Sequence, residues 1–224
     1  KPKNVVGLLF REEQAGYLAG YAAGLAEKRR TGKDQYIVAS VGGMKEPPVD
    51  RFISGFEKGA RDAVVGPGAV GDSIAMSGYS QDWEDVAKCK ELALQYISRG
   101  AGVIFQVAGG CGLGALDAAK EKGVWGIGVD ADQSFLGPHV LTSALKRVDA
   151  AVFQTIEKAA NDEFEGGGVT VFGLAEDGVG LGTFSPRFPV EDRKAVEAVA
   201  KRIADGEVAV PREFPKPPPE GSAP

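Results

Sequence analysis

Histidine and cysteine are nearly missing from this chain of 224 residues. The single histidine, His139, would have to serve any histidine-based metal site or any Ser/His or Cys/His catalytic centre, and no partner pattern surrounds it. The two cysteines, Cys89 and Cys111, are too few for a disulfide scaffold and lack the spacing of metal ligands. We therefore expect no enzyme, no metal and no cofactor. The cysteines are either two buried thiols or one disulfide bond.

Long apolar runs and basic clusters are missing as well. The run that comes nearest to a membrane span, Ala15–Ala26, is interrupted by glycines and is shorter than the roughly 20 apolar residues that cross a bilayer. The net charge is −5 and the lysines and arginines are scattered, which argues against a nucleic-acid partner. Hydrophobic residues make up 43% of the chain, enough to form a packed core.

Strand-like and helix-like segments alternate along the chain. Apolar runs predict strands at Val5–Phe10, Tyr36–Val41, Val70–Met76, Gly102–Val107, Val124–Val129, Val140–Leu145 and Val169–Leu174. Helical periodicity predicts helices at Arg11–Lys28, Val49–Ala63, from a cap at Gln81 or Asp82 to Ser98, from Gly112 to Lys122, Arg147–Phe164 and Glu191–Ala204. This alternation predicts parallel sheets with right-handed crossovers and helices on both faces. The Pro-rich residues 211–224 are expected to form a flexible tail.

Glycines recur every fourth residue in the first predicted helix. Gly16, Gly20 and Gly24 fall on one side of it. Without side chains there, a neighbouring backbone can approach closely. The spacing therefore predicts close packing of this helix on a sheet or on another helix.

The ends of the predicted strands carry candidate ligand-binding residues. In open parallel sheets, ligands bind beyond the carboxyl ends of the strands. Those ends hold Met44, Trp83, Gly109, Gly110, Asp130, Asp132 and Lys146. Each has a plainer interpretation: the glycines permit a tight turn, the tryptophan packs in the core, the aspartates cap a strand end, and the lysine is a solvated charge. Asp130 and Asp132 lie two apart, so on an extended chain both point the same way.

Five segments together resemble basic membrane protein (BMP) family lipoproteins. These segments are Asn4–Gly24, Val41–Phe56, Asp82–Glu91, Val103–Gln133 and Leu141–Asp149. Members of that family are substrate-binding components of ABC transporters, and the best-understood ones bind purine nucleosides. The resemblance implies an α/β type I periplasmic-binding-protein fold of two Rossmann-like lobes with parallel sheets.

The resemblance also assigns roles to site residues. Trp83 falls at the family's base-stacking aromatic, and Gly109 lies in the turn whose backbone approaches the ligand. Asp130 occupies the position of the ribose-binding carboxylate, with Asp132 as the alternative. Lys146 matches the lysine near the sugar.

The family pattern begins with a signal peptide, a lipobox cysteine and a long amino-terminal segment, none of which matches residues of this chain. The resemblance thus implies an incomplete amino-terminal lobe in residues 1–35, a carboxy-terminal lobe in 36–141, a return to the first lobe and crossover in 142–210, and the tail. We expect exposed apolar surface in the incomplete lobe, on the Ala/Gly face of Arg11–Lys28.

The function implied is capture of a nucleoside between two lobes and its delivery to an ABC permease. The protein is expected outside the cytoplasm, held at the membrane by a lipid anchor that this chain does not contain. A ligand-sensing regulatory module of the same fold, or a binder of another small solute, remains the alternative. An enzyme on a Rossmann-like scaffold would need a nucleophile–base pair or a cofactor fingerprint, and neither is found.

Overall fold

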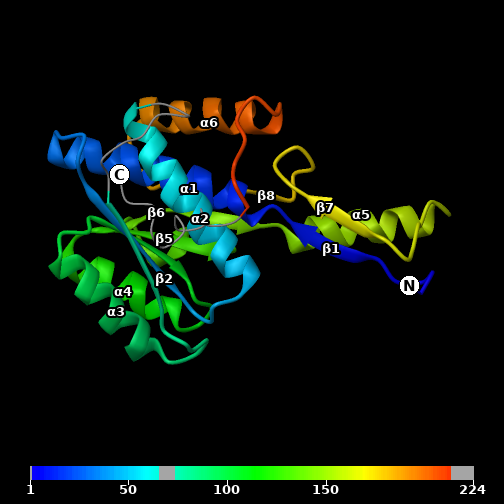
Figure 1. The fold of residues 1–224 in the computed structure, drawn as a ribbon, viewed down its shortest axis with the longest axis horizontal. Coiled ribbons are helices and arrows are strands. Elements are labelled where there is room, and N and C mark those ends of the chain that lie inside the picture. Colours follow the sequence, from blue (N-terminus) through cyan, green and yellow to red (C-terminus); the bar gives the residue numbers. More distant parts are fainter. Residues whose placement is uncertain (1, 66–73, 213–224) are drawn as a thin grey trace, which may run out of the picture.

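A six-stranded sheet forms the centre of the larger part of the molecule (Figure 1). The computed structural model describes residues 2–65 and 74–212. The strand order is β3 (Ile74–Tyr79), β2 (Ile37–Gly42), β4 (Val103–Val107), β5 (Trp125–Asp130), β6 (Val140–Lys146) and β8 (Val179–Leu181). All neighbouring pairs are parallel except β6–β8, which is antiparallel. The predicted parallel α/β architecture is confirmed.

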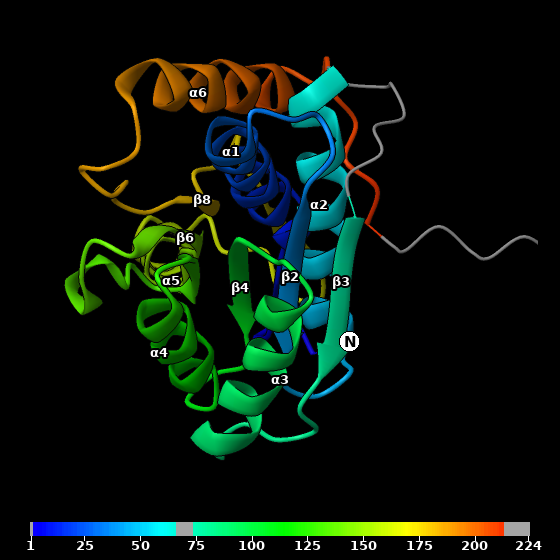
Figure 2. The ribbon, with the colours of Figure 1, turned by 90° about the vertical axis from the view of Figure 1, so that its left-hand side faces the viewer.

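Helices cover both faces of this sheet, as Figure 2 shows. α1 (Glu12–Thr31) and α2 (Pro47–Val65) pack together on one face, and α3 (Val86–Ser98) and α4 (Gly112–Lys122) on the other. α6 (Val190–Ala204) lies outside α1. The central strand β4 is buried along its whole length because helices cover it from both sides.

The contact between α1 and α2 is a reciprocal glycine contact. A Cβ atom added to Gly16 or Gly20 would lie 2.1 or 2.0 Å from the carbonyl oxygen of Phe52 or Phe56. In return, a Cβ atom on Gly55 or Gly59 of α2 would lie 2.0 Å from a carbonyl oxygen of α1. The two backbones therefore touch directly, and the predicted close packing is on a helix.

This contact corrects the expected placement of α1. The division at residue 35 assigned this helix to the amino-terminal lobe, but α1 packs on α2, β6 and β8 of the larger sheet. Its Ala/Gly face is consequently buried, with Ala15, Ala19 and Ala22 at 0% exposure, so it is not the exposed apolar surface that the sequence predicted. Most of β6, together with β8 and α6, falls in the segment 142–210, which was expected to return to the first lobe, but these elements also belong to the larger part.

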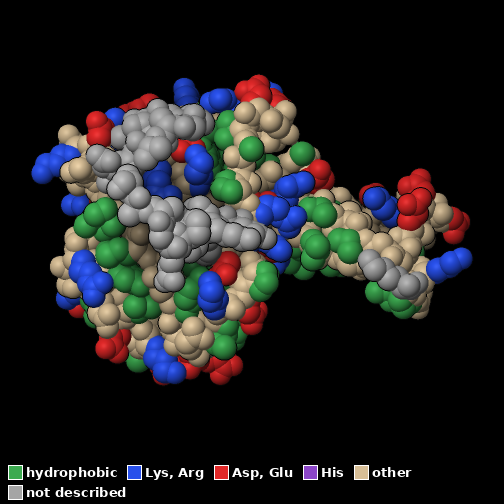
Figure 3. All heavy atoms as spheres, viewed as in Figure 1, with side chains coloured by type: hydrophobic (Ala, Val, Ile, Leu, Met, Phe, Trp, Pro, Cys, Tyr) green, Lys and Arg blue, Asp and Glu red, His purple; other side chains and the backbone are tan. Residues whose placement is uncertain are grey.

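A second, two-stranded sheet projects from the body as an arm (Figures 1 and 3). It pairs β1 (Gly7–Phe10) with β7 (Val169–Phe172) in parallel, outside the six-stranded sheet as predicted. α5 (Val148–Ala160) runs along the pair. Exposed apolar side chains lie on this arm, at Val148, Val152, Phe153 and Ile156 of α5 and at Leu9 and Val169 of the strands.

Three backbone connections join the arm to the body. They run from β1 to α1 through Arg11, from β6 to α5 through Arg147, and from β7 to β8. The Arg11 amide donates to the carbonyl of Phe172 at 2.9 Å, and the Arg147 amide donates to that of Gly178 at 2.8 Å. The connections thus lie side by side. Of the expected tail 211–224, residues 213–224 lie outside the described residues, and the first part of the strand expected at Val70 also does.

Replacing Gly20 by alanine tests the glycine contact. Helix propensity favours alanine by about 1 kcal/mol, but the new methyl group would meet the backbone oxygen of Phe56, which cannot move alone. We expect Gly20→Ala to lower the free energy of unfolding by about 1–3 kcal/mol, the usual cost of overpacking. Gly168→Ala is the control, because nothing lies within 4 Å of its added Cβ. Urea unfolding of both variants measures the difference, and equal stability would contradict direct backbone contact.

Candidate functional site

A cleft of about 270 Å³ opens at the carboxyl edge of the six-stranded sheet. It is lined by Glu46, Pro48, Val49, Phe52, Trp83, Val107, Gly109, Val129, Asp130 and Lys146. Since parallel strands end at a common edge, residues that follow β4, β5 and β6 meet residues from the start of α2. Four of the seven predicted site residues therefore share one cleft. Their part in binding stays a prediction.

Trp83 is held by a tight turn after β3. The Ser80 and Gln81 amides donate to the carbonyls of Gly42 and Gly43, at 2.8 and 3.0 Å. The indole ring lies against Gly43, where an added Cβ would come within 2.5 Å of ring carbons. The side chain is 38% exposed, so part of the ring is open to solvent. Gly43 therefore provides the space in which the ring lies beside the cleft.

The carboxylates of Asp82 and Asp85, next to Trp83 in sequence, stabilise the turn and the start of α3 and do not line the cleft. Asp82 accepts from the amides of Glu84 and Asp85 at 2.9 and 3.1 Å and pairs with Lys88 at 2.8 Å. The Lys88 ammonium and these amides hold the pKa of Asp82 well below its usual range. Asp85, rather than Gln81 or Asp82, caps α3 by accepting from the Ala87 amide.

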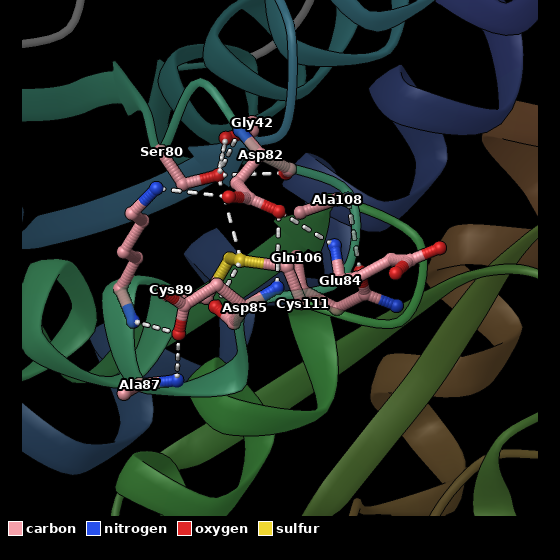
Figure 4. The surroundings of a disulfide bond; sticks show 11 residues. Gly42, Ser80, Asp82, Glu84, Asp85, Ala87, Cys89, Gln106, Ala108 and Cys111 are labelled. Carbon is pink, nitrogen blue, oxygen red and sulfur yellow. Dashed lines mark hydrogen bonds and ion pairs between the residues drawn. A yellow bond between two sulfur atoms is a disulfide. The ribbon is translucent and has the colours of Figure 1, made fainter.

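A disulfide bond between Cys89 and Cys111 lies behind this turn (Figure 4). The two Cα atoms are 5.6 Å apart, and both cysteines are fully buried. Of the two alternatives that the sequence left open, the structure has the bond. It joins α3 to the residue before α4, and the Cys111 amide donates to the carbonyl of Trp83 at 2.8 Å. The bond thus supports the segment that carries the indole.

Gly109 and Gly110 form the turn between β4 and α4. Gly109 has φ +57°, a left-handed conformation that glycine adopts without strain. Added Cβ atoms on Gly109 and Gly110 would lie 3.4 and 3.3 Å from the Trp83 carbonyl oxygen. Both glycines therefore adjoin the Trp83 segment, but only Gly109 lines the cleft.

Asp130 ends β5 in an unusual backbone conformation. Its φ of +64° is left-handed, which aspartate tolerates better than most residues. The chain is therefore not extended after it, and the expectation that Asp130 and Asp132 point the same way is wrong. Asp132 turns away to accept from the Ser134 and Thr183 amides, at 3.0 and 3.1 Å, and does not line the cleft.

The carboxyl group of Asp130 lies at the cleft with neighbours of both signs. Crowding by protein atoms raises its pKa, the Lys146 ammonium opposes this rise, and the Glu12 carboxylate adds to it. In the part of the chain that the structure describes, this carboxylate has no hydrogen bond or ion pair. It is available to a ligand.

Lys146 ends β6, and its ammonium group is held by Glu12 and Phe10. Its Nζ lies 3.1 Å from Oε1 of Glu12 and 5.1 Å from the centre of the Phe10 ring. Glu12, in the first turn of α1, is 2% exposed, and its other oxygen lies 3.3 Å from Nη1 of Arg51. Sequence reasoning missed Glu12, because an acidic residue that opens a helix normally favours the helix dipole at the surface.

The remaining predicted residues do not line the cleft, whereas residues that were not predicted do. Met44 is half-buried after β2 and does not line the cleft. Phe52 and Glu46 line it without having been predicted, because only the packing of α2 brings them over the strand ends. His139 is buried at the start of the β6 region, away from the cleft, and burial lowers its pKa. The described residues contain no helix that could span a membrane and no cluster of three potential metal ligands.

Three comparisons relate this chain to known proteins. A family model described as ABC transporter substrate-binding protein PnrA-like (Bmp) matches residues 1–213. Basic membrane protein A of Borreliella afzelii is 34% identical over 214 residues, which cover 94% of this chain and 62% of that protein. A solute-binding protein of an ABC transporter system from Aeropyrum pernix K1 has a TM-score of 0.78 at 26% identity, covering 94% of this chain and 68% of that one.

A transcriptional activator of the comK gene from Bacillus halodurans has a TM-score of 0.79 at 23% identity, covering 96% of this chain and 69% of that one. At that identity the likeness shows the fold alone. The chain thus spans about three fifths of the length of the curated relative named above, at 62%.

Removing the disulfide tests its structural role. The bond closes a loop between residues 22 apart, and loop-closure entropy predicts a stabilisation of about 3 kcal/mol. We expect the double variant Cys89→Ala/Cys111→Ala to lose about that much free energy of unfolding. A reductant should lower the stability of the unsubstituted protein and leave the double variant unchanged. Stability unaffected by reductant in both proteins would show that the bond does not form.

Proposed function

This chain belongs to the PnrA-like family of ABC transporter substrate-binding proteins, and from that membership we propose that it captures a nucleoside, in the first instance a purine nucleoside, for a membrane permease. The family consists of binding proteins, so the sequence-based prediction that the protein is not an enzyme agrees with the match. The predicted α/β periplasmic-binding-protein fold with parallel sheets is confirmed. The solute, its delivery and the surroundings of the protein are proposals.

The observation that carries the proposal is one unpaired carboxylate beside one partly open aromatic ring. Asp130 and Trp83 line the same cleft. A nucleoside has a flat base, whose face can stack on an indole. It also has a ribose diol, whose hydroxyl groups can donate to a carboxylate. The two side chains match these two parts of one molecule.

Two further residues support this arrangement. Lys146 lines the cleft, and the N–H donors that its ammonium does not use for Glu12 could donate to ribose oxygens. Gly109 lines the cleft without a side chain, so a ligand can approach its backbone. Phe52 and Val49 supply an apolar floor. The mechanism is capture, with no bond made or broken.

We further propose that the protein works outside the cytoplasm, as an anchored lipoprotein. The buried Cys89–Cys111 disulfide supports this, because such bonds persist in oxidising compartments and are rare in the cytosol. The relative from Borreliella afzelii is called a basic membrane protein, which also supports a place at the membrane. The family description supports delivery to a permease.

Trp83→Ala tests the stacking role in the full-length protein. Base–aromatic stacking contributes roughly 1–3 kcal/mol, so inosine should bind about ten-fold to a hundred-fold more weakly. Trp125→Phe is the control, because Trp125 starts β5 at the opposite edge of the sheet, under Arg187. That control also leaves Trp83 as the remaining tryptophan. Inosine should therefore quench its fluorescence. Unchanged affinity in Trp83→Ala would reject stacking.

Asp130→Asn tests the diol contact. Asparagine tolerates the left-handed backbone at this position, so the change removes charge without adding strain. Calorimetric titration should show a loss of about ten-fold or more for inosine and little change for hypoxanthine, which has no diol. Equal losses for both would exclude Asp130 as the ribose ligand. Binding of free ribose as tight as that of inosine would indicate a sugar-binding protein instead.

The raised pKa of Asp130 predicts a pH dependence with a definite sign. The diol needs the ionised carboxylate as acceptor, and that form is fully present only above the pKa of the free protein. Inosine affinity should therefore fall as the pH falls through this raised pKa, beginning at a higher pH than for an ordinary aspartate. The Asp130→Asn variant should lack the effect. Affinity that is constant until ordinary carboxylates titrate would contradict it.

A further inference from the structure

Glu12 is a buried carboxylate that does not line the cleft itself but pairs with Lys146, which does. It comes from the first turn of α1, directly after the connection from the arm, and is 2% exposed. Burying a carboxylate is costly unless it is paired. Both of its oxygens are paired, one with Lys146 of β6 at 3.1 Å and one with Arg51 of α2 at 3.3 Å.

Lys146 has a second acidic neighbour within reach. β5 and β6 are paired so that Asp130 lies beside Leu145, one residue before Lys146. Adjacent strands are about 4.8 Å apart, well within the span of a lysine side chain. Yet among the described residues Lys146 forms its ion pair with Glu12, and Asp130 has none.

We propose that Glu12 is a positioning residue that holds Lys146 away from Asp130 and thereby keeps the Asp130 carboxylate free for the ligand. Without the negative charge of Glu12, Lys146 would turn to Asp130, the acid at the end of the neighbouring strand. The site would then be occupied by its own ion pair, and a ligand would have to break that pair before binding.

The charges around Asp130 favour this account. Lys146 and Glu12 act on it directly, from β6 and α1. Glu46, before α2, lines the same cleft, whereas Arg51 pairs with Glu12 and does not line it. Glu13 faces elsewhere, with its Oε1 3.5 Å from Arg212 and 3.9 Å from Arg11. Glu12 is therefore the acid that competes with Asp130 for Lys146.

The first test needs no ligand. The pKa of the Asp130 carboxyl is measured by NMR titration of the full-length protein, with and without Glu12→Gln. The substitution removes a repelling charge and releases Lys146, so the pKa of Asp130 should fall. Arg51→Gln is the matched control, because it removes the other partner of Glu12 and leaves the Lys146 pair in place. An unchanged or raised pKa in Glu12→Gln would overturn the proposal.

The second test rests on the proposed function and uses inosine. Glu12→Gln should weaken binding by up to about five-fold, which corresponds to breaking one partly exposed ion pair. The loss would occur although Asp130 is more fully ionised, a combination that general damage to the fold does not produce. In a background of Lys146→Met, Glu12→Gln should cause no further loss, since the cation proposed to occupy Asp130 is absent. A further loss there would contradict the mechanism.

A third variant covers failure of Glu12→Gln to fold. Glu12→Asp keeps the charge but shortens its reach to Lys146, so both effects should appear with the same sign and smaller size. If inosine does not bind the unsubstituted protein, the proposed function fails, while the ligand-free titration still decides the role of Glu12. The two failures are therefore distinguishable.

Discussion

The direct backbone contact between α1 and α2 is the constraint on which the rest of the structure depends. Gly16 and Gly20 face carbonyl oxygens of α2, and Gly55 and Gly59 face those of α1, so the helices have one possible separation. That separation closes one face of the sheet. It also fixes the first turns of both helices over the strand ends, where α1 contributes Glu12 and α2 contributes Arg51 and Phe52. Core packing and the cleft therefore have a common cause.

The sequence predicted those features that depend on local pattern. Apolar runs separated by helical periodicity were enough for the parallel sheet, and the rule that ligands bind beyond strand ends brought Trp83, Gly109, Asp130 and Lys146 to one edge. The glycine spacing in α1 predicted a close contact but not its partner, since spacing along one helix carries no information about the surface it meets. The resemblance had assigned α1 to the other lobe, and the spacing alone could not correct that assignment.

The sequence-based predictions that failed at the site depended on backbone turns and packing that a sequence pattern does not contain. Asp130 and Asp132 were treated as an extended pair, but a left-handed residue at the strand end turns the chain between them. Glu12 looked like an ordinary acid at the start of a helix, and its burial follows only from the meeting of three elements distant in sequence. Met44 and Gly110 adjoin the right strands without reaching the cleft. A pattern along the chain cannot distinguish a neighbour of the site from a member of it.

The side-by-side arrangement of the three connections has a consequence for the order of folding. The strand pairs of the body join residues 14 to 65 positions apart, whereas the arm pairs Gly7 with Val169, 162 positions apart. Closing so long a loop in an unfolded chain is slow, because its entropy must be lost before the contacts form. Once the body has formed, α1 and β8 are in contact, so the stretches of chain that lead into β1 and β7 already start close together. The pairing of β1 with β7 then needs little further loss of chain entropy. We therefore expect the body to fold first and the arm to form on it.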